Sequence, residues 1–393
     1  MRLSRFRFAF LASIGHAVIE LCSQFLPVVY PILVDTMGLS YTQVGGLALV
    51  SSLGTSLAQP LFGHLSDRWD PRWITVLSMA WIGLLMGLVG WANSYGLLLV
   101  VIGLGVLGSA AFHPCGATIA ASQAGDRPGA SVSVFSVGGS VGSALSPLLI
   151  TAAVQRFGMR GTSAVTPVAL FFGVILLWQF RQVTIRREEK QSATHESERS
   201  SSVVRLILVV LAVMCFAWFQ GSFRTYLALW IESQGQSLAT GGQLLFVFLA
   251  MNGVGSLLGG AASDRMERWQ MLALCFGLLV PVHWFFVSAS GPLQWILVGV
   301  MGMLLGATFP VSIVMAQETW TQGVGIASGL VMGLGWVPSG IGSSVTGMIA
   351  DRISLEVGLR TLVVPVLIGL GFIMLYGAVS RRAMGKQEEA LPA

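Results

Sequence analysis

Two titratable side chains lie four residues apart in an apolar segment near the start of the chain. His16 and Glu20 therefore share one face if the segment is helical. If that helix crosses a membrane, a carboxylate inside it costs at least about 2.5 kcal/mol, so it is rare and usually functional. Desolvation favours the protonated form of Glu20, which could carry a proton or contact a substrate. The alternative is structural, with His16 and a neighbouring helix satisfying Glu20 by hydrogen bonds.

A second histidine precedes a proline in another apolar segment. His113 titrates near neutral pH, so it could relay a proton or bind an anionic group. A buried, hydrogen-bonded structural histidine fits this position equally well. Pro114 removes a backbone donor and is expected to bend its helix, which would free carbonyl groups toward a cavity. We group His16, Glu20 and His113 as candidate proton-coupling residues.

An arginine lies well inside a further apolar segment, among aromatic side chains. The guanidinium of Arg224 stays charged and can hold a carboxylate, phosphonate or phosphate by paired hydrogen bonds. It could instead extend to the membrane interface or pair with Glu232. If Arg224 faces a cavity, the substrate is anionic or zwitterionic. The candidate substrate-binding residues are Arg224, Phe112, Tyr30, Gln24, Trp218 and Tyr226.

The composition predicts that these side chains lie in a membrane. Of 393 residues, 54% are hydrophobic and 10% are charged, against about 25% charged in soluble domains. Four scattered cysteines resemble small hydrophobic residues more than a disulfide framework. No Ser/His/Asp set, metal-ligand cluster or phosphate-binding loop is recognisable, so we predict no enzyme, no cofactor and no metal.

Twelve apolar runs have the length that a bilayer core of about 30 Å requires. They cover residues 8–33, 41–65, 73–92, 95–122, 129–155, 163–181, 203–230, 239–262, 269–288, 292–316, 324–349 and 357–380. A long polar stretch separates the sixth from the seventh. We therefore predict an all-α membrane protein with a six-helix bundle at 1–181, a cytoplasmic linker at 182–202 and a second bundle at 203–393.

Positive charge predicts the orientation. With the N-terminus inside, most of the 22 Lys and Arg fall at cytoplasmic ends, loops and tails. Both termini are then cytoplasmic, and the membrane is expected to be a bacterial cytoplasmic (inner) membrane. The net charge of +5 belongs to this bias and does not argue for nucleic acid. The expected partners are the lipid bilayer, protons and a small-molecule substrate, and the chain is expected to act as a monomer.

The two halves repeat one another. "GHLSDRWDPRW" at residues 63–73 is followed, 197 residues later, by "GAASDRMERW" at residues 260–269. Further matches continue at an offset of 196, among them Pro114 with Pro310 and Gly139 with Gly335. Two parallel six-helix repeats are the architecture of major facilitator transporters, whose substrate cavity lies between the halves.

The whole chain resembles a transporter of that superfamily. Its loop signature is a glycine, three residues, Asp-Arg and then a basic cluster, and residues 63–68 match it. The match departs at Asp70 and Pro71, where the signature prefers glycine and a basic residue. Three features resemble the fosmidomycin resistance protein family within it: residues 16–31, with Glu20 where an Asp is expected, "FHP" at 112–114 and "SVGGSVGSALSP" at 136–147.

The resemblance implies a role for the repeated loops. Asp67 and Asp264 would each approach the start of a helix in the other half, near Gly325 and Gly129, where helix-terminal N–H groups favour a carboxylate. Such contacts would form a conformational latch that breaks when the cavity opens inward. The alternative is ordinary solvated loop charge. The latch residues would be Asp67, Arg68, Asp264 and Arg265.

Small residues in the fifth segment are expected to allow close helix packing. These helix-packing residues are Gly138, Gly139, Gly142 and Pro147. Exporters of the superfamily often carry adjacent Gly and Pro in this helix, and here the two are separated.

The implied function is a proton-driven efflux antiporter of small organic compounds or drugs, anionic if Arg224 faces the cavity. The alternative is a proton-coupled importer of a small organic anion or nutrient. A membrane-embedded enzyme and a channel fit the residues less well.

Overall fold

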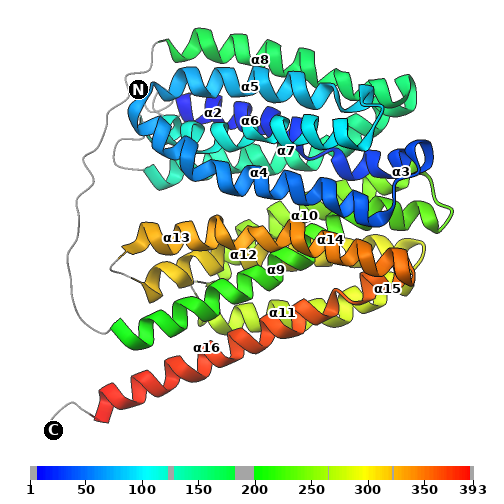
Figure 1. Cartoon of the computed structure of the whole chain (residues 1–393). Coiled ribbons are helices and arrows are strands. Elements are labelled where there is room, and N and C mark those ends of the chain that lie inside the picture. Colours follow the sequence, from blue (N-terminus) through cyan, green and yellow to red (C-terminus); the bar gives the residue numbers. More distant parts are fainter. Residues whose placement is uncertain (1–6, 123–127, 182–198, 264, 321–322, 390–393) are drawn as a thin grey trace. The chain divides into compact units, whose positions relative to one another are not determined.

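The computed structural model describes residues 7–122, 128–181, 199–263, 265–320 and 323–389, and the regular elements in these ranges are helices (Figure 1). The chain divides into two compact units. One comprises Met1–Glu189 with Arg224–Ala250, and the other Lys190–Phe223 with Met251–Ala393. The division runs through α9 (Arg199–Ser233), so residues 224–250 group with the first unit.

The first unit is built around α2. Its principal helices are α2 (Arg7–Ser23), α3 (Leu26–Met37), α4 (Tyr41–Arg68), α5 (Pro71–Gly87), α6 (Tyr95–Ser122), α7 (Pro128–Phe157) and α8 (Val165–Phe180). Helix α2 packs against α5, α6, α7 and α8, while α4 and α5 both pack on α6. Central α2 is thereby buried along most of its length, and Ile19 is fully inaccessible. A polar side chain on α2 must find its partners among these neighbours.

The second unit contains the later helices of the chain. They are α11 (Arg268–Ser288), α12 (Pro292–Thr319), α13 (Val324–Met332), α14 (Val337–Arg352), α15 (Leu355–Arg360) and α16 (Val363–Glu389), with parts of α9 and of α10 (Leu238–Ser263). Helix α11 packs on α12 and α16 around an apolar core that includes Leu272, Val311 and Ile373. This unit therefore has a hydrophobic core of its own.

The membrane-spanning architecture agrees with the sequence prediction. Eleven segments of the described residues are long and apolar enough to cross a bilayer. One of them, residues 131–180, is 50 residues long and holds both α7 and α8, joined by the short 3-10 helix η2 (Gly158–Ala164). Counting α7 and α8 separately gives twelve spans, as predicted.

Prolines account for how two helices begin. The predicted span at 8–33 is two helices, because Pro27 cannot donate the backbone bond that would continue α2, and α3 starts anew after a turn at Gln24 and Phe25. At the start of α5, Asp70 accepts a hydrogen bond from the Arg72 backbone N–H at 3.0 Å, and Pro71 occupies the first turn. Asp70 and Pro71, which depart from the superfamily loop signature, thus form the start of α5.

Candidate functional site

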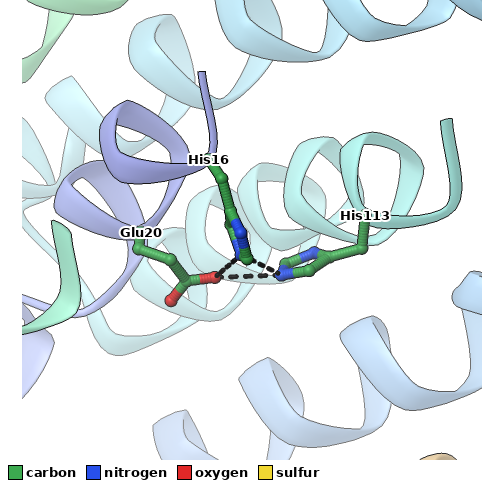
Figure 2. Close-up of side chains that lie close together, drawn as sticks. All are labelled: His16, Glu20 and His113. Atoms are coloured by element: carbon green, nitrogen blue, oxygen red, sulfur yellow. Dashed lines mark hydrogen bonds and ion pairs between the residues drawn. The ribbon is translucent and has the colours of Figure 1, made fainter. Parts of the chain in front are cut away.

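The three candidate proton-coupling residues meet inside the first unit. His16 and Glu20 project from α2, and His113 projects from α6 toward them (Figure 2). Glu20 Oε1 lies 3.0 Å from His113 Nε2 and 3.7 Å from His16 Nε2. The two Nε2 atoms are 3.2 Å apart. One carboxylate oxygen and two imidazole nitrogens therefore share a single small space.

The outer nitrogen of each ring is committed to a backbone carbonyl. His16 Nδ1 lies 2.9 Å from the Phe135 carbonyl oxygen, and His113 Nδ1 lies 2.7 Å from that of Ser109. Because a carbonyl can only accept, each Nδ1 carries the proton, and in a neutral ring Nε2 is then an acceptor. Three acceptor atoms thus converge, and they need a shared proton or another cation between them.

The second oxygen of Glu20 is held by neutral donors. Gln24 Nε2 donates to Oε2 at 2.6 Å, and Ser143 Oγ donates to it at 3.1 Å. The side chains of His16 and Glu20 are 11% and 9% exposed, whereas that of His113 is 26% exposed. The α2 members of the cluster are thus buried, and His113 is partly exposed.

A cationic side chain reaches the cluster through Gln24. The guanidinium of Arg224 donates to Gln24 Oε1, so one amide joins the arginine to the Glu20 carboxylate. The break before Pro27 places Gln24 in the turn where it can make both contacts. Nε of Arg224 is buried and has no hydrogen-bond partner. The contact with Gln24 and the buried Nε atom thus place the Arg224 side chain inside the first unit.

Glycines of α7 let that helix approach α2 closely. A Cβ at Gly138 would collide with the Ser13 carbonyl, and one at Gly142 with the Ala17 carbonyl. At Gly139 it would collide with the His16 ring itself. The α7 chain continues through Pro147 without interruption. These small residues therefore set the position of the His16 imidazole.

Several predicted substrate-binding side chains have packing roles. Phe112 is fully buried and stacks on Phe135, with ring centroids 6.2 Å apart. Tyr226 is also fully buried and donates its hydroxyl to the Tyr41 carbonyl at 2.8 Å.

Tyr30 is only 2% exposed and lies in the interior of the first unit. Trp218 belongs to the second unit, where its ring lies against Gly342. Of the six predicted residues, Gln24 and Arg224 are the two whose hydrogen bonds lead to Glu20.

The predicted latch residues are only partly visible. Asp264 and the side chain of Asp67 lie outside the described residues, as do the side-chain environments of Gly129 and Gly325. Arg68 and Arg265 are exposed. The latch remains a prediction.

Sequence reasoning missed two serines that complete the site. Ser143 binds Glu20, and Ser109 supplies the carbonyl that orients His113, with its hydroxyl 3.3 Å from the same Nδ1. A signal for Ser143 was present, because it follows Gly139 by four residues and so faces α2 from the same side of α7.

Comparison with known proteins shows which family the chain belongs to and which proteins it resembles. The family model of the Major Facilitator Superfamily matches residues 12–335. The fosmidomycin resistance protein of Escherichia coli is 27% identical over 354 residues, which cover 88% of this chain and 86% of that protein. The multidrug resistance protein MdtG of Enterobacter lignolyticus is 25% identical over 396 residues, covering 96% and 91% respectively.

A solved structure has the same fold. A bacterial homologue of the human lysosomal transporter Spinster, in an inward-facing and occupied conformation, superposes with a TM-score of 0.79 at 14% identity. The match covers 94% of this chain and 96% of that one.

Proposed function

Because the chain belongs to the major facilitator superfamily, we propose that it is a proton-coupled efflux antiporter that exports small organic compounds, drugs among them, by alternating access. The names of the relatives, resistance proteins for fosmidomycin and for multiple drugs, support export of such compounds. Its place would be a bacterial cytoplasmic membrane, with both termini inside and the chain acting as a monomer.

The observation that carries the proposal is the shared position between Glu20, His16 and His113. A proton placed there is bound by one carboxylate oxygen and by imidazoles that cannot otherwise satisfy their Nε2 lone pairs. The partial exposure of the His113 side chain supports a route by which the proton enters and leaves. Buried ionisable groups in transporters commonly act as proton relays.

Substrate would be linked to the proton through Gln24. The charge of Arg224 would favour the ionised form of Glu20, since one amide contacts both. A substrate anion bound at Arg224 would neutralise that charge and favour protonation of Glu20. Because coupling is reciprocal, protonation would then favour binding of the anion. A neutral or cationic substrate that contacts Glu20 would instead compete with the proton, as antiport requires.

Transport in proteoliposomes tests the proposal. A panel of drugs and organic acids is offered to vesicles containing purified protein, with and without an imposed pH gradient. We expect the pH gradient to drive uphill transport of at least one compound, in the direction opposite to proton flow. Glu20→Gln should abolish this transport. If the pH gradient drives none of the transported compounds, the proposed coupling is wrong.

A second candidate is a proton-coupled importer of a small organic anion, and the link from Arg224 to Glu20 is the observation that favours it. The two candidates differ in how their affinity for substrate should depend on pH. For an importer, affinity for the anion rises as the pH falls, whereas for an antiporter affinity for the exported compound falls. Replacing Gln24 by Leu should weaken either dependence, and Gln270→Leu on α11 is the matched control.

A further inference from the structure

The converging donors of the first unit have the composition of a metal site. Two imidazole nitrogens and one carboxylate oxygen form a triangle with sides of 3.0, 3.2 and 3.7 Å. The three residues were not recognised as a ligand set from sequence, because 93 positions separate Glu20 from His113. The structure brings their ligand atoms within 4.8 Å of one another.

The dimensions of the triangle fit one ion. Ligands about 2.1 Å from a tetrahedral Zn²⁺ are about 3.4 Å from one another, within the range of these three sides. The point equidistant from the three atoms lies about 1.9 Å from each, in their plane. An ion at ordinary bond lengths would therefore sit just out of that plane. Its fourth position would stay open for water or another ligand.

The surroundings orient the ligands as metal sites require. A ligating histidine usually donates its other ring N–H to a carbonyl or carboxylate, which fixes the tautomer and raises ligand basicity. His16 does so toward Phe135, and His113 toward Ser109. Oε2 of Glu20, which faces away from the histidines, is held by Gln24 and Ser143. Each of the three ligands is thus supported by an independent contact.

The donor set also selects the class of ion. Imidazole suits Zn²⁺, Co²⁺, Ni²⁺ and Cu²⁺, whereas Mg²⁺ and Ca²⁺ prefer oxygen donors alone. The partial exposure of His113 would let an ion reach the ligands. Arg224 contacts the cluster through Gln24, on the Oε2 side of Glu20, and so leaves the space between the histidines clear.

We propose that His16, Glu20 and His113 bind a single divalent transition-metal ion of the Zn²⁺ class. The ion would exclude the proton from the same space and so inhibit pumping, a consequence that rests on the proposed function. Metal binding itself does not depend on transport, so it is measured on purified protein in detergent.

Cobalt titration provides the test. The full chain, purified without a polyhistidine tag, is titrated with Co²⁺ and then with Zn²⁺ while visible absorption is followed. We expect one Co²⁺ per chain, with the strong bands of a tetrahedral site, and its displacement by Zn²⁺. Glu20→Gln and His113→Gln should each weaken binding at least ~10-fold. His64→Gln changes an exposed histidine at the end of α4 and should leave it unchanged.

A substitution that retains a ligand guards against misfolded variants. His113→Cys supplies a thiolate, so the cobalt complex should gain a thiolate-to-metal charge-transfer band in the near ultraviolet. No saturable cobalt signal in the wild type would overturn the proposal. So would equal affinity in wild type, Glu20→Gln and His113→Gln, or a cobalt spectrum of His113→Cys without that band.

Discussion

The imidazoles of His16 and His113 meet edge to face, with ring centroids 4.9 Å apart and planes at 86°. Their Nε2 atoms point at one another across 3.2 Å, and neither has a proton to donate while both rings are neutral. This pairing joins α2 to α6 at the position where we propose that a proton or a metal ion binds. Experiments on this protein should therefore measure whether a proton or a metal ion occupies that position.

Glu20→Gln should separate coupling from binding. Glutamine keeps the shape of the side chain and an amide that can hydrogen-bond, but it imitates only the protonated state. We expect substrate binding and substrate-for-substrate exchange to persist, while uphill transport driven by a pH gradient is lost. Both are measured in proteoliposomes. Glu356→Gln, which alters an exposed pair with Arg360, is the control and should pump normally. Pumping by Glu20→Gln with unchanged pH dependence would pass the coupling role to His16 or His113.

Arg224→Lys tests geometry against charge. Lysine retains the positive charge but loses the planar fork that holds a carboxylate or phosphonate by two bonds. For an anionic substrate we expect affinity to fall about tenfold, or ~1.4 kcal/mol. Apparent affinity from transport at varied substrate concentration is the measurement, and Arg352→Lys, at the exposed end of α14, is the control. Equal affinity in the two variants would remove Arg224 from the binding site.

Gly139→Ala should disturb the cluster by displacing the His16 ring. The added methyl group would meet the His16 ring, so the ring or the α7 backbone must shift, and overpacking of this kind costs about 1–3 kcal/mol. We expect a lower melting temperature and weaker pumping. Gly277→Ala is matched to it, because that helical glycine faces open space, and the change should be neutral or stabilising by up to about 1 kcal/mol. Similar melting shifts in the two variants would contradict close packing at Gly139.

Asp67→Asn tests the latch. If the carboxylate contacts a helix start in only one of the alternating states, its loss should slow transport severely while expression stays near wild type. Asp264→Asn should act in the same direction but less strongly. Asp70→Asn offers the control, because asparagine still caps α5, while the partly exposed ion pair with Arg72, which contributes little to stability, is lost. Transport at the wild-type rate in Asp67→Asn would favour the solvated-loop alternative.

The sequence alone determined the class of this protein. The twelve spans are patterns of neighbouring residues, and the bilayer demands them of any chain that crosses it so often. The repeat and the superfamily loop are also visible in the sequence alone. The pairing of His16 with Glu20 was equally accessible, because helical periodicity brings residues four apart onto one face. The small residues of α7 likewise indicated close packing before any partner was known.

Only the tertiary structure decided which groups share the site. His113 reaches Glu20 because α6 packs on α2, and Ser143 reaches it because glycines admit α7. Arg224 contacts Gln24, which is 200 positions away in the chain. Gln24 can make this contact because it lies in the turn before Pro27. A long side chain can reach several partners, so its choice depends on which helix passes within hydrogen-bonding distance. That distance is set by packing, which no local pattern specifies.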